Sequence, residues 1–174
     1  MREIFTSARG DRLDARTSST WVTVRRLPGT QGGAAYAGPL MDVTTAMLAD
    51  FAQVREGLLF VSSGGITRCY REQLPAPLGV HLAIVLELDR LEAERPHEVR
   101  VVVVDEDGGE LAEIAGEIQL GETALMVNEN LNLPITFDLR NVPVERFGAV
   151  EVRCYVGGEH RTTLPLWVMQ TPTP

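Results

Sequence analysis

The sequence predicts an all-β sandwich of about eight strands. Short segments that alternate apolar and polar residues recur between residues 43 and 168. Since the side chains of a strand point alternately to its two faces, this period-two pattern is typical of half-buried strands. Turn residues close the segments at intervals of about 8 to 12 residues, the spacing of sandwich strands. The clearest segment, His97–Asp105, runs directly into Asp107-Gly108-Gly109, a tight-hairpin signal.

The first elements are less regular than the later ones. Residues 43–48 are β-branched at their start and then drift toward helix formers through residue 54, which predicts a strand that runs into a turn or a helical turn. Glu56-Gly57 predicts a turn before a strand at 58–61. Residues 62–65, Ser-Ser-Gly-Gly, predict a bulge or bend before a strand at 66–70, and residues 74–77, with two prolines, predict a loop.

The later strands carry the expected core. Each alternating segment places its apolar residues on one face, which we expect to point between the sheets. These inward positions are Val80, Leu82, Ile84, Leu86 and Leu88; Ala112, Ile114, Gly116, Ile118 and Leu120; and Leu131, Leu133, Ile135, Phe137 and Leu139. Two further strands are expected at 150–156 and 162–168, joined by a Gly157-Gly158 turn.

Residues 1–40 differ from the rest of the chain. Serine, threonine, glycine, alanine and arginine dominate, and the only strand-like stretch is Thr20–Val24. A segment of this composition buries too little apolar surface to order itself. We therefore expect a disordered basic arm, or an extension ahead of a true start at Met41, followed by a sandwich domain at residues 41–170.

Charge limits the classes of partner. The chain carries a net charge of −8, and residues 41–174 hold ten Arg against 21 acidic residues. Such a body repels phosphate backbones and anionic lipid surfaces, so neither nucleic acid nor a membrane is an expected partner. Residues 1–6 lack the apolar core of a signal peptide, and the two cysteines, Cys69 and Cys154, sit in strand patterns as expected of reduced core thiols. A cytoplasmic location is expected.

The sequence shows no pattern typical of catalysis or of a cofactor site. His81, His97 and His160 lack zinc-ligand spacing and are expected near strand ends, facing solvent. Ser63 lies in no nucleophile elbow, so an esterase-like or phosphatase-like hydrolase is a distant third hypothesis. We expect no enzyme, no catalytic residue, no metal ligand and no cofactor. The alternative is a small-ligand or calcium site in end loops, at which Asp89, Asp105 and Asp107 would converge.

One candidate interaction surface emerges from the strand pattern. If the strands at 80–88 and 97–105 are neighbours, their outward residues form an apolar patch, which the outward Trp167 would extend. The alternative is that another part of the chain covers this face. The residues of this predicted patch are Ala83, Val85, Val102, Val104 and Trp167.

Several short motifs occur along the chain: Thr44–Asp50, Val54–Val61, Ser63–Gly65, Pro75–Leu78, His97–Val101, Val104–Gly108 and Leu131–Pro134. Together they resemble the motifs of an uncharacterised bacterial family known only as a domain of unknown function. They occur in family order over about residues 41–170. The resemblance implies an immunoglobulin-like or C2-like sandwich and brings no catalytic residue, cofactor or substrate.

The fold and the absence of recognisable chemistry favour one functional class. We expect a non-enzymatic cytoplasmic sandwich that binds another protein or itself. The identity of that partner does not follow from the sequence.

Overall fold

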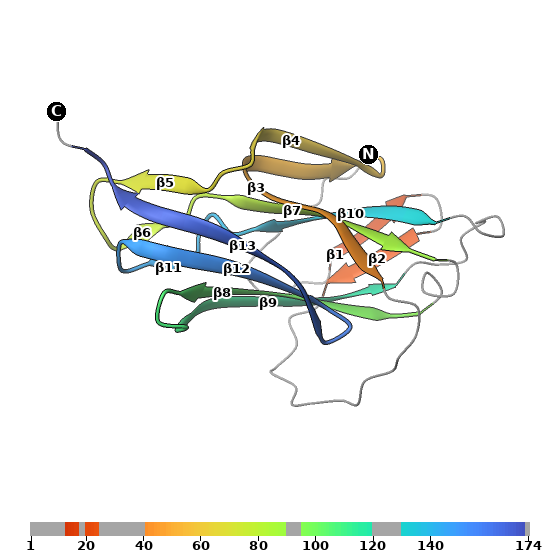
Figure 1. Cartoon of the computed structure of the whole chain (residues 1–174). Helices are drawn as coiled ribbons and strands as arrows, with labels where there is room; N and C mark the ends of the chain where they lie inside the picture. The colour runs from red at the N-terminus through yellow and green to blue at the C-terminus, as the bar shows by residue number, and fades with distance from the viewer. Residues whose placement is uncertain (1–12, 18–19, 25–40, 90–94, 120–129, 173–174) are drawn as a thin grey trace.

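The computed structural model describes residues 13–17, 20–24, 41–89, 95–119 and 130–172. They form an all-β molecule of two packed sheets (Figure 1), so the predicted fold class is confirmed. No helix able to cross a membrane occurs among these residues.

The larger sheet has seven strands in the order β1-β2-β9-β8-β12-β13-β5. Neighbours pair antiparallel except β13 and β5, which run parallel. The strands are β1 (Leu13–Thr17), β2 (Thr20–Val24), β5 (Arg68–Arg71), β8 (His97–Asp105), β9 (Glu110–Gln119), β12 (Gly148–Val156) and β13 (Glu159–Gln170).

The second sheet has four strands in the order β10-β7-β3-β4, and a two-stranded ribbon pairs β6 with β11. The strands are β3 (Asp42–Arg55), β4 (Leu58–Gly64), β7 (His81–Leu88), β10 (Leu131–Asp138), β6 (Ala76–Pro77) and β11 (Pro143–Val144). The described residues form more strands than the eight or so that were predicted. β1, β2, β6 and β11 are additional, and the segment interrupted at residues 62–65 forms two strands, β4 and β5, in different sheets.

The core lies between the two sheets, where the alternation placed it. Every predicted inward residue of the 80–88 segment is buried, and β8, β12 and β13 supply the facing valines and leucines. Cys69 and Cys154 are buried free thiols on β5 and β12, as predicted. The turns at Glu56-Gly57, Gly108 and Gly157-Gly158 all adopt the positive φ angles that such tight turns require.

Two segments before β7 differ from the predictions. Residues 42–55 form one long strand without a helical turn, because β7 pairs with its first half and β4 with its second half. Pairing on both sides thus overrides the helix propensity of its centre. Residues 13–17 and 20–24 pair with each other and extend the larger sheet at β9, in place of the disorder expected there. The other residues of the predicted arm lie outside the described ones.

The β3–β4 hairpin (residues 49–64) leaves the sheet and lies over it. Beyond Ala49, β3 has no pairing with β7, and both strands of the hairpin come close to β10 (Figure 1). At its base the carbonyl oxygen of Asp50 lies 3.0 Å from Nδ1 of His81, and the ring of Phe51 meets that imidazole edge-on. The hairpin therefore covers part of the outer face of β7.

Candidate functional site

The predicted patch does not form, because its two strands belong to different sheets. β7 lies in the four-stranded sheet and β8 in the seven-stranded one. Ala83 is fully buried and Val85 half-buried on the face that the β3–β4 hairpin covers. The prediction of a common apolar surface from β7 and β8 is therefore wrong.

Val102 and Val104 do face outward from β8, yet they are buried. Val102 lies opposite Arg153 and Glu113 on the flanking strands, and Val104 lies opposite Glu151. Charged side chains with long aliphatic stems cover apolar surface while their heads stay in water. Arg153 and Glu151 pair at 2.7 Å, which holds both stems above the valines.

Trp167 is the one residue of the predicted patch that is freely exposed, at 52%. On the outer face of β13 and β5 it lies near Tyr70 and Met169, and we call these three residues the edge patch. Arg68 lies directly beside Trp167 in the register. The edge patch is thus small and interrupted by a cation.

A larger exposed apolar surface, which was not predicted from the sequence, lies on the β3–β4 hairpin. Among the residues that the structure describes, four of the eight exposed large apolar ones lie there: Phe51, Leu58, Phe60 and Val61. Leu58 is 63% exposed and Phe60 47%. Phe51 and Phe60 lie diagonally across the two strands on one face, because Phe60 pairs with Gln53 and Phe51 with Ser62. We call these four residues the hairpin surface.

A sequence signal for the hairpin surface was available. The segment Leu58–Gly64, Leu-Leu-Phe-Val-Ser-Ser-Gly, has no charged residue and does not alternate. A non-alternating apolar run in a strand predicts burial on both faces, whereas only Leu59 within Leu58–Val61 is even half-buried.

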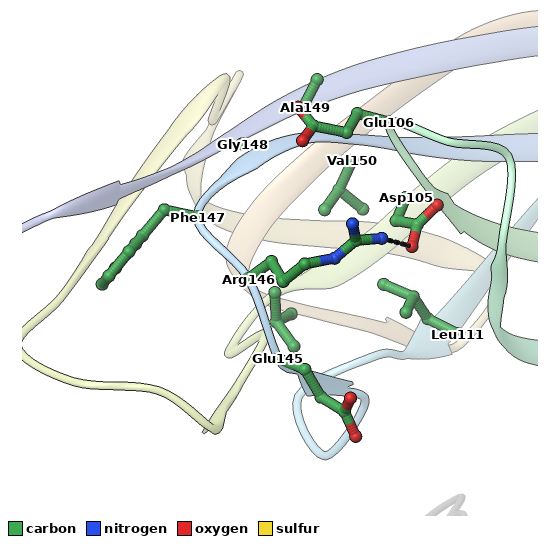
Figure 2. Close-up of a pocket in the computed structure, with 10 residues that line it drawn as sticks. Asp105, Glu106, Leu111, Glu145, Arg146, Phe147, Gly148, Ala149 and Val150 are labelled. Atoms are coloured by element: carbon green, nitrogen blue, oxygen red, sulfur yellow. Dashed lines mark hydrogen bonds and ion pairs between the residues drawn. The ribbon is translucent and has the colours of Figure 1, made fainter.

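The proposed calcium ligands do not converge. Asp89 follows the end of β7, close to the start of β8, whereas Asp105 and Asp107 lie at the far end of β8. Arg146 already pairs with both, at 2.6 Å to each carboxylate, and the Asp105 contact is drawn in Figure 2. No cluster of three metal-ligating side chains occurs within the described ranges.

Hydrogen bonds lower the pKa of two acidic groups, Asp105 and Asp138. Asp105 accepts the backbone N–H of Gly109 and bonds Arg146, and both hold the pKa of its carboxyl below the ordinary value. The bidentate contact of Arg140 does the same for the pKa of Asp138. Both carboxylates are therefore ionised partners of arginines, which fits a structural role.

A pocket beside Arg146 is too small for a typical organic ligand. Its volume is about 90 Å³, against roughly 300 Å³ or more for sites that enclose small molecules. Charged residues, among them Asp105, Glu106 and Arg146, line it (Figure 2). This geometry does not favour the small-ligand alternative.

The histidines are not arranged as a site. His81 is buried against Asp50 and Phe51, which corrects the expectation that it faces solvent. His160 is exposed, bonds Thr163 and meets Tyr155 edge-on. His97 is half-buried at the start of β8.

The two thiols should be unreactive in the folded protein. Burial raises the pKa of Cys69, and it raises the pKa of Cys154 to about 12. At pH 8 only about one Cys154 in ten thousand would be the reactive thiolate. We expect no labelling by iodoacetamide in the native state and labelling of both cysteines in denaturant. Native labelling of Cys154 at the denatured rate would contradict this burial.

Comparisons with known proteins place the chain in a family. The profile of a family of unknown function (DUF6941) matches residues 44–169, most of the chain. The chain belongs to this family. The match agrees with the resemblance seen in the sequence motifs, and it covers both the hairpin surface and the edge patch.

The other two comparisons with known proteins do not indicate a function for the chain. No curated protein matches the sequence. A solved structure of Pseudomonas fluorescens alkylpurine DNA glycosylase AlkC, bound to DNA containing an abasic site analog, is similar over 74% of this chain, with 13% identity and a TM-score of 0.40. The chain spans only 30% of that structure.

Proposed function

We propose that the protein is a non-enzymatic interaction module that binds a protein through the hairpin surface. The proposal rests on one observation: β4 is an apolar, uncharged strand that lies at the edge of its sheet. Large exposed apolar patches of soluble proteins mark contact sites, and an unpaired strand edge offers main-chain hydrogen bonds as well.

Two other sheet edges, β5 and β10, are protected against strand pairing, unlike β4. β5 has only four residues and an arginine at each end, and β10 carries Pro134. Charge, proline and short length are the usual means of preventing unwanted strand pairing. β4 has seven residues and no charge or proline. An edge left unprotected beside others that are protected supports a binding role.

The acidic net charge favours a protein over a nucleic acid or a membrane as the partner. We propose a cytoplasmic bacterial protein with a protein partner, since a net charge of −8 disfavours phosphate backbones and anionic lipids. An immunoglobulin-like or C2-like kinship of the sandwich stays a prediction from the family resemblance.

Phe60→Glu is expected to reduce binding by more than about tenfold, because a charge in an apolar contact must be desolvated. The measurement is capture of partners from a lysate of the source cells on the full chain, quantified against the wild-type protein. Trp167→Glu is the matched control, because it makes the same change at a similarly exposed aromatic residue of the edge patch. Equal loss for both variants, or loss only for Trp167→Glu, would place the contact elsewhere.

A further inference from the structure

The backbone of β4 presents a defined hydrogen-bonding edge. Glu56 and Gly57 form a two-residue turn with φ of 53° and 75°, so Arg55 and Leu58 are a hydrogen-bonded pair. Since such pairs alternate along an antiparallel ladder, Phe60 also bonds to β3. The N–H and C=O groups of Leu59 and Val61 therefore point away from β3, toward the open edge.

Space is open beside the two glycines that flank β4. A Cβ atom added to Gly57 or to Gly65 would meet no other atom within 4 Å. Within the described residues, β3 is the only strand that pairs with β4. The backbone just before and just after β4 is therefore open, whereas a Cβ atom on Gly64, the last residue of β4, would meet the side chains of Met47 and Val61.

We propose that a second copy of this chain binds here, by antiparallel pairing of β4 with β4 of the other molecule. This inference rests on the proposed function and names its partner. A two-fold axis at Phe60 places Leu59 opposite Val61 of the second copy, and Val61 opposite Leu59. Each of these outward backbone groups then finds a partner, as a two-fold interface requires.

The side chains complete the same symmetric contact. Phe60 meets Phe60 of the second copy across the axis, and the two Phe51 rings lie diagonally beyond them on the same face. On the opposite face Val61, which is 37% exposed, gains cover from Leu59 of the second copy. The apolar surface that is exposed on the hairpin of one molecule would thus be buried against the same surface of the second copy.

Charge favours this occupant over a charged peptide. β4 itself carries no charge, and the two charged residues just before it in the chain, Arg55 and Glu56, pair with each other at 4.0 Å. Two molecules with a net charge of −8 each repel elsewhere on their surfaces, so they can approach best along an uncharged edge.

The decisive measurement is the mass of the full-length protein in solution, followed by sedimentation over a range of concentrations. We expect the wild-type protein to dimerise, Phe60→Glu to weaken the dimer about 100-fold by placing two like charges opposite each other, and Trp167→Glu to leave it unchanged. Val61→Pro should also weaken it, since proline removes an outward N–H that β3 does not use. A monomeric wild-type protein, or a dimer that survives both hairpin variants, overturns the proposal.

Cysteine cross-linking tests the register. Residues at a two-fold axis in a non-hydrogen-bonded pair have Cα atoms about 4.5 Å apart, within the range for a disulfide. Mild oxidation should therefore link Phe60→Cys into a covalent dimer. Leu58→Cys, which would face Ser62 of the second copy, should link much less, and the buried native thiols give no background. Equal linking of both variants, or none of Phe60→Cys, overturns the register.

These outcomes separate the two proposals. If the wild-type protein is monomeric but captures a protein in a Phe60-dependent manner, the second-copy inference fails and the proposed function stands. If it is monomeric and captures nothing through the hairpin, both fail.

Discussion

Leu82→Ala should lower the free energy of unfolding by about 2 to 5 kcal/mol. Leu82 is fully buried on the inner face of β7, in the cluster that both sheets share. Replacing its isobutyl group by a methyl group leaves a cavity that a close-packed core fills only in part, so the cost exceeds that of transfer from water alone. Denaturant unfolding of the full chain measures the change through the midpoint at constant slope.

Leu58→Ala is the matched control for this prediction. It removes the same atoms from a side chain that is 63% exposed on β4, so its cost should stay within about 0.5 kcal/mol. A large cost at Leu58, or a small one at Leu82, would contradict the assigned burial. A small cost at Leu58 beside a large cost at Leu82 would mean that the apolar side chain of Leu58 adds little to the stability of the single molecule.

The sequence was sufficient to predict the core, because alternation reports which residues share one face of a strand. Leu82, Ile84 and Leu86 lie where the period-two pattern placed them. The Asp-Gly and Gly-Gly turns were equally readable, since few residues adopt positive φ without strain. These are local properties, so they do not depend on which strand lies beside which.

The predicted patch failed because strand order is not a local property. β7 and β8 are consecutive in the chain, and consecutive strands often pair, yet here they belong to opposite sheets. In addition, the alternation shows that a residue points out of the sandwich, but it does not show whether another part of the chain covers that residue. The β3–β4 hairpin covers part of the face that carries Ala83, while ion-paired stems cover Val102.

The exposure of the hairpin surface could not be predicted for a different reason. An uncharged run such as Leu58–Val61 predicts burial on both faces, and the sequence cannot show that the hairpin leaves its sheet after Ala49. If β4 pairs with a second copy, the run becomes consistent with its prediction. The apparent exception is then a strand whose second neighbour lies in another molecule.

Gly79→Ala is expected to cost about 2 to 3 kcal/mol, for two separable reasons. Gly79 has φ of +74°, a left-handed conformation that costs an L-residue about 1 to 2 kcal/mol. A Cβ atom there would also collide with the guanidinium of Arg71. That group donates to the carbonyl oxygens of Pro77 and Leu78, at 2.9 and 2.6 Å, and ties β5 to the end of β6, just before β7.

Gly57→Ala separates the two reasons. Gly57 has nearly the same φ, +75°, but a Cβ atom there would enter open space, so only the backbone cost applies. Equilibrium unfolding of both variants, each also in an Arg71→Ala background, isolates the contact with Arg71. In that background the cost of Gly79→Ala should fall to that of Gly57→Ala. If it does not fall, the guanidinium moves aside freely, and Arg71 does not fix the path from β5 to β7.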